Sequence, residues 1–100
     1  MFAVVLSFDG ESAGDLTAGI EHVKDEAIPS LAEADGLHGW WLADPASGQR
    51  LTVMVWDTEE HYQAGMARVQ EARAKDPSRH RAAPSTVTRF QVYGSITGAG

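Results

Sequence analysis

The sequence predicts an α+β fold, in which four strands form one antiparallel sheet and two helices lie on one of its faces. Three observations predict it: the elements follow in the order strand, helix, strand, strand, helix, strand, both helical segments carry a one-sided apolar stripe, and a turn-rich segment joins the two central strands. A chain of 100 residues with 43% apolar content can form one core. We expect one domain over residues 1–94 and a flexible tail at 95–100.

The first half of the chain predicts a strand and a long helix. Phe2–Phe8 is rich in β-branched and aromatic residues and ends at an Asp-Gly turn pair. Ser12 resembles the start of a capping box, and apolar residues then recur at helical spacing over residues 16–34. Pro29 lies within this pattern. Because proline has no amide hydrogen to donate, we expect it to kink the helix or to restart it.

The second half predicts a hairpin, a helix and a last strand. Leu37–Ala43 and Leu51–Trp56 are the hairpin strands, and DPASGQ is the connection between them. Asp57 or Thr58 caps the next helix, whose inward stripe consists of Tyr62, Met66, Val69 and Ala72. The segment KDPSRHRAAPS has two prolines and no periodicity, so we expect a loop before the strand Thr86–Tyr93.

Two βαβ-like halves around a central hairpin are typical of the ferredoxin-like arrangement. Both helices then cover the same face of the sheet, and the other face should carry polar side chains. The strand sequences FAVVLSF, GWWLA and LTVMVW are nevertheless apolar on both sides. An exposed apolar face of that size is unusual in a monomer, so we expect a second copy to cover it in a homodimer.

Composition and motifs exclude several classes of function. A net charge of −6 argues against nucleic-acid binding, and the absence of cysteine excludes disulfides, iron–sulfur clusters and thiol catalysis. There is no phosphate-binding glycine loop and no nucleophile elbow, and no apolar run approaches the roughly 20 residues that cross a bilayer. His22 and Glu26 have a metal-like spacing but are too few ligands. We expect a soluble, cytoplasmic protein without a metal or other cofactor.

Charge is distributed unevenly along the chain. Residues 1–50 carry a net charge of −7 and residues 51–100 one of +1, with five cations between Arg68 and Arg81. These cations suit a solvated helix end and loop. The alternative is a site for an anionic ligand or for an acidic partner surface.

Two segments carry a resemblance to a known family. The junction AEADGLHGWWLADP and the segment LTVMVWDTEEHYQAG resemble the antibiotic biosynthesis monooxygenase family of dimeric α/β-barrel proteins, over about residues 2–93. The resemblance implies two ferredoxin-like sheets closed into a shared barrel. It implies less about activity, because this fold also hosts isomerases, dehalogenating enzymes and haem-degrading enzymes.

Members that oxidise polycyclic phenols without a cofactor place an asparagine, a tryptophan and a tyrosine around a pocket between sheet and helices. Here Trp56 and Tyr62 match, while Thr52 replaces the asparagine and lacks its two-sided amide. His38, beside two tryptophans, is a candidate titrating group. The candidate site residues are the catalytic Tyr62, Trp56 and Thr52 and the substrate-binding Ser7, His38 and Met66. Trp56 and Tyr62 also suit ordinary core packing.

Three functions therefore remain open. The first is a cofactor-independent monooxygenase acting on a small apolar phenolic or quinone-type compound. The second is a non-catalytic homodimer that binds an apolar ligand. The third is a structural or stress-related dimer without a pocket, and a cavity would favour the first two.

The haem-degrading members offer a further comparison. They use an asparagine on the first strand, a tryptophan in the second helix and a histidine as iron ligand, and here those places hold Ser7, Gly65 and Ala74 or Lys75. His80 is the nearest histidine to the ligand region, but it serves only if its loop folds over the pocket. We expect no haem binding.

Overall fold

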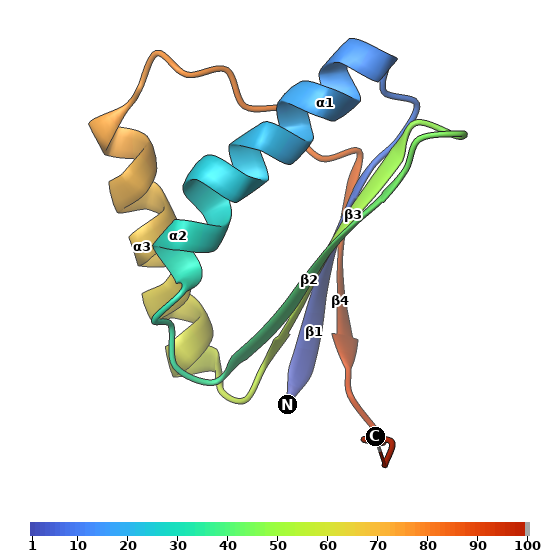
Figure 1. Cartoon of the computed structure of the whole chain (residues 1–100). Coiled ribbons are helices and arrows are strands. Elements are labelled where there is room, and N and C mark those ends of the chain that lie inside the picture. Colours follow the sequence, from blue (N-terminus) through green and yellow to red (C-terminus); the bar gives the residue numbers. More distant parts are fainter. Residues whose placement is uncertain (100) are drawn as a thin grey trace.

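The computed structural model describes residues 1–99, and its elements follow the predicted order (Figure 1). They are β1 (Phe2–Phe8), α1 (Ala13–His22), the π-helical turn η1 (Val23–Ala27), α2 (Ile28–Leu31), β2 (Leu37–Asp44), β3 (Gln49–Trp56), α3 (Glu59–Lys75) and β4 (Thr86–Gln91). The strands form one antiparallel sheet in the order β2-β3-β1-β4. The helices all lie on one face of it, which confirms the predicted ferredoxin-like fold.

Strand register decides which side chains face the helices. Val4 on β1 lies opposite Met54 on β3, and both are buried in the core with Leu31 and Trp56. Alternation along each strand sends the intervening residues to the other face. The core therefore fills the space between the sheet and the helices.

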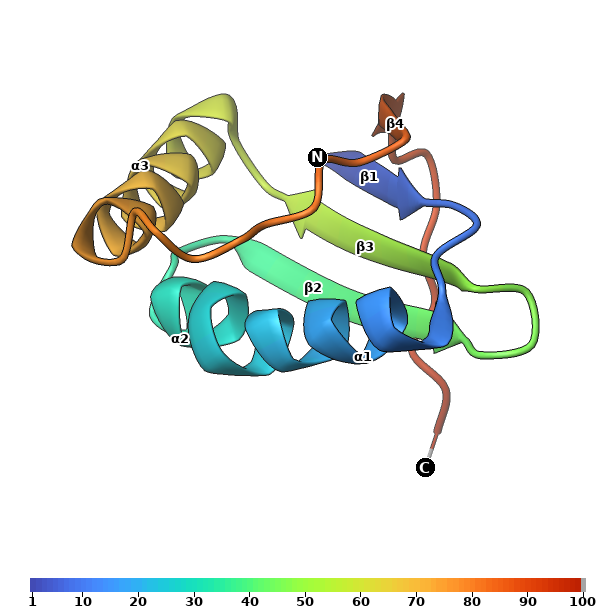
Figure 2. The same ribbon diagram turned by 90° about the horizontal axis from the view of Figure 1, so that it is seen from above.

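The first helix begins and continues as its sequence predicts. The side chain of Ser12 accepts a hydrogen bond from the Asp15 amide, which caps the helix start. Near Pro29 the helix widens into the π turn, where the amide of Ile28 donates to the carbonyl of Val23, five residues earlier. Pro29 then occupies the first turn of α2, where no amide hydrogen is needed. Figure 2 shows α1 and α2 as one continuous rod.

The second half differs from its prediction only in detail. Thr58, rather than Asp57, caps α3 by accepting a hydrogen bond from the His61 amide. Strand β3 begins two residues earlier than predicted, because Gln49 pairs with Asp44 next to the turn of the hairpin. Strand β4 ends at Gln91, so the predicted last two residues lie outside it. The segment between α3 and β4 contains no helix or strand, as predicted.

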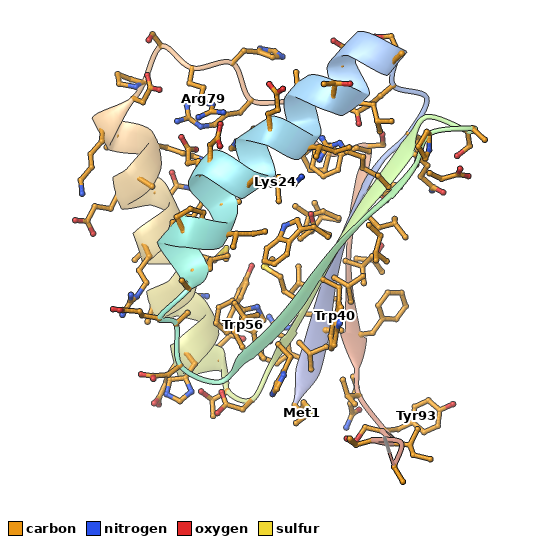
Figure 3. All side chains as sticks on the ribbon, viewed as in Figure 1. Met1, Lys24, Trp40, Trp56, Arg79 and Tyr93 are labelled. Carbon is orange, nitrogen blue, oxygen red and sulfur yellow. The ribbon has the colours of Figure 1, made fainter. Side chains whose placement is uncertain are left out.

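The face of the sheet opposite the helices carries large exposed apolar side chains. Trp40, Leu42 and Phe90 are 52%, 49% and 53% exposed, whereas Trp56 on the helix side is fully buried. Figure 3 shows Trp40 and Trp56 on opposite sides of the sheet. The observed register therefore places the second set of apolar residues of β1, β2 and β3 on the face of the sheet that no helix covers.

Residues 92–99 follow the last strand without forming a helix or strand, and Tyr93 and Ile96 are exposed. Residue 100, part of the predicted tail at 95–100, lies outside the described residues. No helix in residues 1–99 is long and apolar enough to cross a membrane.

Candidate functional site

A cavity of about 260 Å³ lies between the sheet and the helices. Its middle is apolar, since β1 and β2 contribute Leu6 and Trp41, and the helical side contributes Val23, Leu31 and Met66. Polar side chains line the remainder. Among them are Glu11, Asp15, His22, Arg50, Thr52, Arg73, His80 and Arg81.

The helix-facing residues of β3 show where the cavity ends. Arg50, Thr52 and Met54 all line it, but Trp56, the next residue on that face, does not. Alternate residues of a strand are about 6.5–7 Å apart, so Trp56 lies well beyond Thr52. Of the sequence-predicted site residues, Thr52 and Met66 line the cavity, and Trp56 and Tyr62 lie beside it.

Trp56 and Tyr62 lie together as predicted, but in a packed cluster. Their ring centroids are 5.7 Å apart in an edge-to-face arrangement, and Phe2 meets Tyr62 in the same way at 5.6 Å. The Trp56 ring also lies against Gly65, where a side chain would overlap it. Because a glycine at this position of α3 admits the indole under the helix, the space expected to be a pocket beside Trp56 is filled.

Ser7 and His38 face away from the cavity. Ser7 lies on the outer face of β1, where its hydroxyl donates to Asp9 and accepts a 3.4 Å hydrogen bond from Gln49. His38 stacks on Trp40 on the same outer face, with ring centroids 6.5 Å apart. The register therefore separates these two residues from Thr52 and Met66. Neither contributes to the cavity wall.

A buried ion pair that sequence reasoning missed forms one part of the cavity wall. Arg50 Nε donates to Glu11 Oε1 at 2.6 Å, and the guanidinium lies 4.2 Å from the centroid of the Phe8 ring. Gly19 leaves room for it, since a Cβ there would approach Arg50 Cζ to 2.5 Å. The sequence could have indicated this position, because strand alternation places Arg50 on the same face of β3 as Thr52 and Met54.

A second ion pair ties the loop 76–85 to the helical layer. Arg81 Nε and Nη2 donate to the two carboxylate oxygens of Glu26, each at 2.6 Å. Arg81 also donates to the backbone carbonyls of Asp76 and Arg79, at 2.9 and 3.0 Å. The hydrogen bonds from Arg81 lower the pKa of Glu26, against the opposing effect of burial. This pairing makes His80 and Arg81 part of the cavity wall.

His80 can serve at the site only if its loop folds over the cavity. Its loop does fold over the cavity. Arg81 binds Glu26, and Arg79 Nη2 lies 3.5 Å from Oδ2 of Asp25, the residue before Glu26. The prolines and charges of this segment predicted a loop. They did not predict that the loop would be held by ion pairs to a helix about fifty residues earlier.

His22 lies where this loop meets the cavity. Its side chain is only 18% exposed and lines the cavity. Burial lowers the pKa of His22; Glu26, 3.7 Å away, opposes this, while Arg79, Arg81 and Arg73 lower it further. Its Nδ1 is buried without a hydrogen-bond partner in residues 1–99. The ring is thus held neutral near pH 7.

The described part of the chain contains no group of three or more His, Asp or Glu side chains placed to hold a metal ion. The cavity instead combines an apolar interior with a neutral imidazole, a hydroxyl and guanidinium groups. Such a set can bind, orient and deprotonate an oxygen-bearing organic compound.

Solved structures with the same architecture cover nearly the whole chain. A monooxygenase of Streptomyces coelicolor, ActVA-Orf6 with bound nanaomycin D, has a TM-score of 0.70 at 16% identity, over 98% of this chain and 92% of that one. A Chloroflexus aurantiacus protein assigned as an antibiotic biosynthesis monooxygenase gives 0.67 at 20% identity, over 97% and 98%. The chain has the antibiotic biosynthesis monooxygenase-like fold. The predicted resemblance is thereby confirmed as a likeness of fold.

A dimeric ferredoxin-like protein from an uncultured marine organism shares this monooxygenase-like fold, with a TM-score of 0.67 at 17% identity over 96% and 97% of the two chains. Sequence similarity to curated proteins is more local. The uncharacterized proteins MT2635 and Rv2558 of two Mycobacterium tuberculosis strains are each 39% identical over 56 residues, which is 55% of this chain. The matched segment spans 24% of the length of each relative. No protein-family profile matches the chain.

Proposed function

We propose that the chain is a cofactor-independent monooxygenase-like enzyme that acts on a small, mainly apolar phenolic or quinone-type compound. The observation that carries this proposal is the cavity of about 260 Å³, whose apolar walls also hold His22 and Thr52. Its size is near the lower end of the range for small-molecule sites, which favours a compact ring compound. A structural dimer without a pocket, the third of the functions left open by the sequence, has less support.

In the proposed reaction the substrate supplies the electrons. Loss of a proton from a phenolic ring system gives an enolate, which reduces dioxygen; a ring methylene becomes a carbonyl, and the second oxygen atom leaves as water. The protein binds, deprotonates and orients the substrate. We assign the proton transfer to neutral His22, because a base must be unprotonated at the working pH. Thr52 provides a hydroxyl to the substrate oxygen, and Met66 provides an apolar wall.

For Trp56 and Tyr62 we propose a supporting role in this site. They pack directly beyond Met54, which is the cavity residue nearest to them on β3. The aromatic cluster thus supports that end of the cavity without lining it. Substitution of Tyr62 by phenylalanine keeps the ring and should leave turnover nearly unchanged, whereas direct participation of the hydroxyl would make turnover fall.

Oxygen uptake with a hydroxyanthrone-type substrate tests the proposal. We expect turnover by the unmodified protein, a loss of about 100-fold or more in His22→Gln because the base is removed, and a smaller loss in Thr52→Val. Ser7→Ala is the matched control, since Ser7 lies on the outer face. Saturable binding of the same compound without oxygen uptake would instead support the non-catalytic ligand-binding alternative.

We further propose that the chain forms a homodimer through the sheet face opposite the helices, in the cytoplasm. The exposed Trp40, Leu42 and Phe90 support this arrangement, because a bare apolar face of this kind needs a cover. A twofold partner presenting the same face provides one. The marine ferredoxin-like protein, which is dimeric, supports the same assembly.

A further inference from the structure

We propose that the cavity holds its ligand as an anion, with a carboxylate or enolate oxygen at the end formed by His22, Arg73 and His80 and with the apolar body toward Met54. This inference rests on the proposed function in one respect only, namely that the cavity is the ligand site. It adds the charge of the ligand and its orientation.

The arginines that line the cavity differ in how their charges are compensated. Arg50 is bound to Glu11, and Arg81 is bound to Glu26. Arg73, near the end of α3, also lines the cavity but forms no ion pair within residues 1–99. One guanidinium at the cavity edge is therefore available to an acidic ligand group, for which its planar donor set is suited.

The surroundings of Arg73 favour an anion rather than a second cation. Three arginines, Arg73, Arg79 and Arg81, act against the protonated form of His22, and one carboxylate, Glu26, favours it. Because Arg81 is paired with Glu26 and Arg79 with Asp25, Arg73 remains as the cation that an anion at this end of the cavity can meet. Neutral His22 adds a hydrogen-bonding nitrogen without adding charge, and His80 lines the same end from the loop.

The Glu26 carboxylate, 3.7 Å from His22, is bound to Arg81, and two other carboxylates line the cavity. Asp15 lines it from the first turn of α1, seven residues before His22, which is about 10 Å along a helix. Glu11 is occupied by Arg50. Beyond His22 along the helical layer, Val23 and Leu31 line the cavity, and Met66 lines it from α3. The arrangement suits an amphiphilic ring compound with one acidic oxygen.

The five cations between Arg68 and Arg81 have different places in the structure. Arg79 and Arg81 serve the fold, since they bind Asp25 and Glu26. Arg68 and Lys75 face an open cleft between the helices and do not line the cavity. Of the cations between Arg68 and Arg81, Arg73 is therefore the one placed to hold a ligand without first breaking an ion pair of the described chain.

Calorimetric titration with matched ligand pairs tests the inference. One pair is 2-naphthoic acid, a carboxylate at pH 7, and 2-naphthalenemethanol, its neutral counterpart. The other is 2-hydroxy-1,4-naphthoquinone, an enolate at pH 7, and neutral 2-methyl-1,4-naphthoquinone. We expect about fivefold or greater preference for the anion in at least one pair, consistent with a partly exposed charge pair. The pair that shows it identifies the acidic group.

Two variants assign the preference to its residue. Arg73→Gln should abolish the preference while the neutral compounds bind as before, and Arg68→Gln on the same helix should leave it intact. Equal affinities within both pairs, or a preference that survives in Arg73→Gln, would overturn the inference while leaving the proposed function standing if the neutral compounds bind. Failure of all four compounds to bind, together with no oxygen uptake from a hydroxyanthrone, would overturn both.

Discussion

The indole of Trp56 lies directly against the backbone of Gly65, so that the end of β3 and the middle of α3 meet without an intervening side chain. Trp56 is fully buried as a result. Gly65→Ala should therefore destabilise the protein by about 1–3 kcal/mol, because the added methyl group overlaps a large ring that has no free space. Chemical denaturation monitored by circular dichroism measures this change.

Gly14→Ala is the control for helix propensity in that experiment. Gly14 also lies in a helix, but nothing lies within 4 Å of the position that a Cβ would occupy. Its replacement should be neutral or stabilise by about 0.4–1 kcal/mol. If Gly65→Ala were as harmless as Gly14→Ala, the close approach of Trp56 to α3 would be wrong.

The pairing of Glu26 with Arg81 predicts a loss of stability in acid. Arg81 lowers the pKa of Glu26 below its ordinary 4.5, so the unfolded state binds more protons in this range. The contribution of the pair is complete well above pH 4.5 and is lost as the pH falls through the folded-state pKa. As the pH is lowered from 6 to 3, the urea midpoint of Glu26→Gln should decrease less steeply than that of the unmodified protein. An unchanged slope would contradict this pairing.

Two histidines predict opposite dependences of stability on pH. Burial lowers the pKa of His22 from 6.5, so stability falls as the pH drops from 6.5 to the folded-state pKa, the range in which the unfolded state binds more protons. Asp57, 2.7 Å from His61, raises the pKa of His61, so that contribution is complete below pH 6.5 and is lost as the pH rises through the folded-state value. Midpoints measured from pH 5 to 8 for His22→Gln and His61→Gln should change slope in opposite directions.

The apolar outer face predicts an assembly that a charge disrupts. Each large side chain buried there should stabilise the dimer by roughly 1.5–3 kcal/mol. Trp40→Glu should therefore give a single-chain mass by light scattering, or unfold the protein. Ile28→Glu is the control, since Ile28 is an exposed apolar residue on the helical layer. A single-chain mass for the unmodified, folded protein at micromolar concentration would exclude the proposed dimer.

Haem should not bind at a defined site. The positions that hold haem in the degrading enzymes correspond here to Ser7, Gly65 and Ala74 or Lys75. Ser7 lies on the outer face, and Gly65 is covered by Trp56. Haemin titration should show only weak, non-saturating changes in the Soret band. A saturable one-per-chain shift that disappears in His80→Ala would show that the loop histidine serves as a ligand.

Much of the fold could be predicted because its determinants are local. The Ser12 cap, the stripe of α3 and the turn pairs are short-range signals, and each has its expected place in the structure. The apolar face of the sheet opposite the helices could be predicted from the alternation of side chains along the strands alone. Pro29 was expected to disturb its helix, and the π turn is the form that the disturbance takes.

The site was harder to predict because it depends on contacts distant in sequence. Arg50 and Glu11 meet only when β3 pairs with β1, which places Arg50 opposite Phe8, and Arg81 reaches Glu26 from a loop without periodicity. His22 and the loop residues His80 and Arg81 line the same cavity although they lie far apart in the sequence. The displacement of the cavity from Trp56 depends on Gly65, whose missing side chain no apolar pattern reveals.

The π turn at Val23–Ala27 makes the site sensitive to the deletion of a single residue from the helix. A π turn closes its hydrogen bond across five residues, as Ile28 does with Val23, so it holds one residue more than an α turn. Removing that residue would leave a continuous α-helix but rotate everything before it by about 100° relative to α2. His22 and Gly19 would then leave the cavity together. The polar end of the site thus depends on one additional residue, which a single-codon deletion removes without breaking the helix.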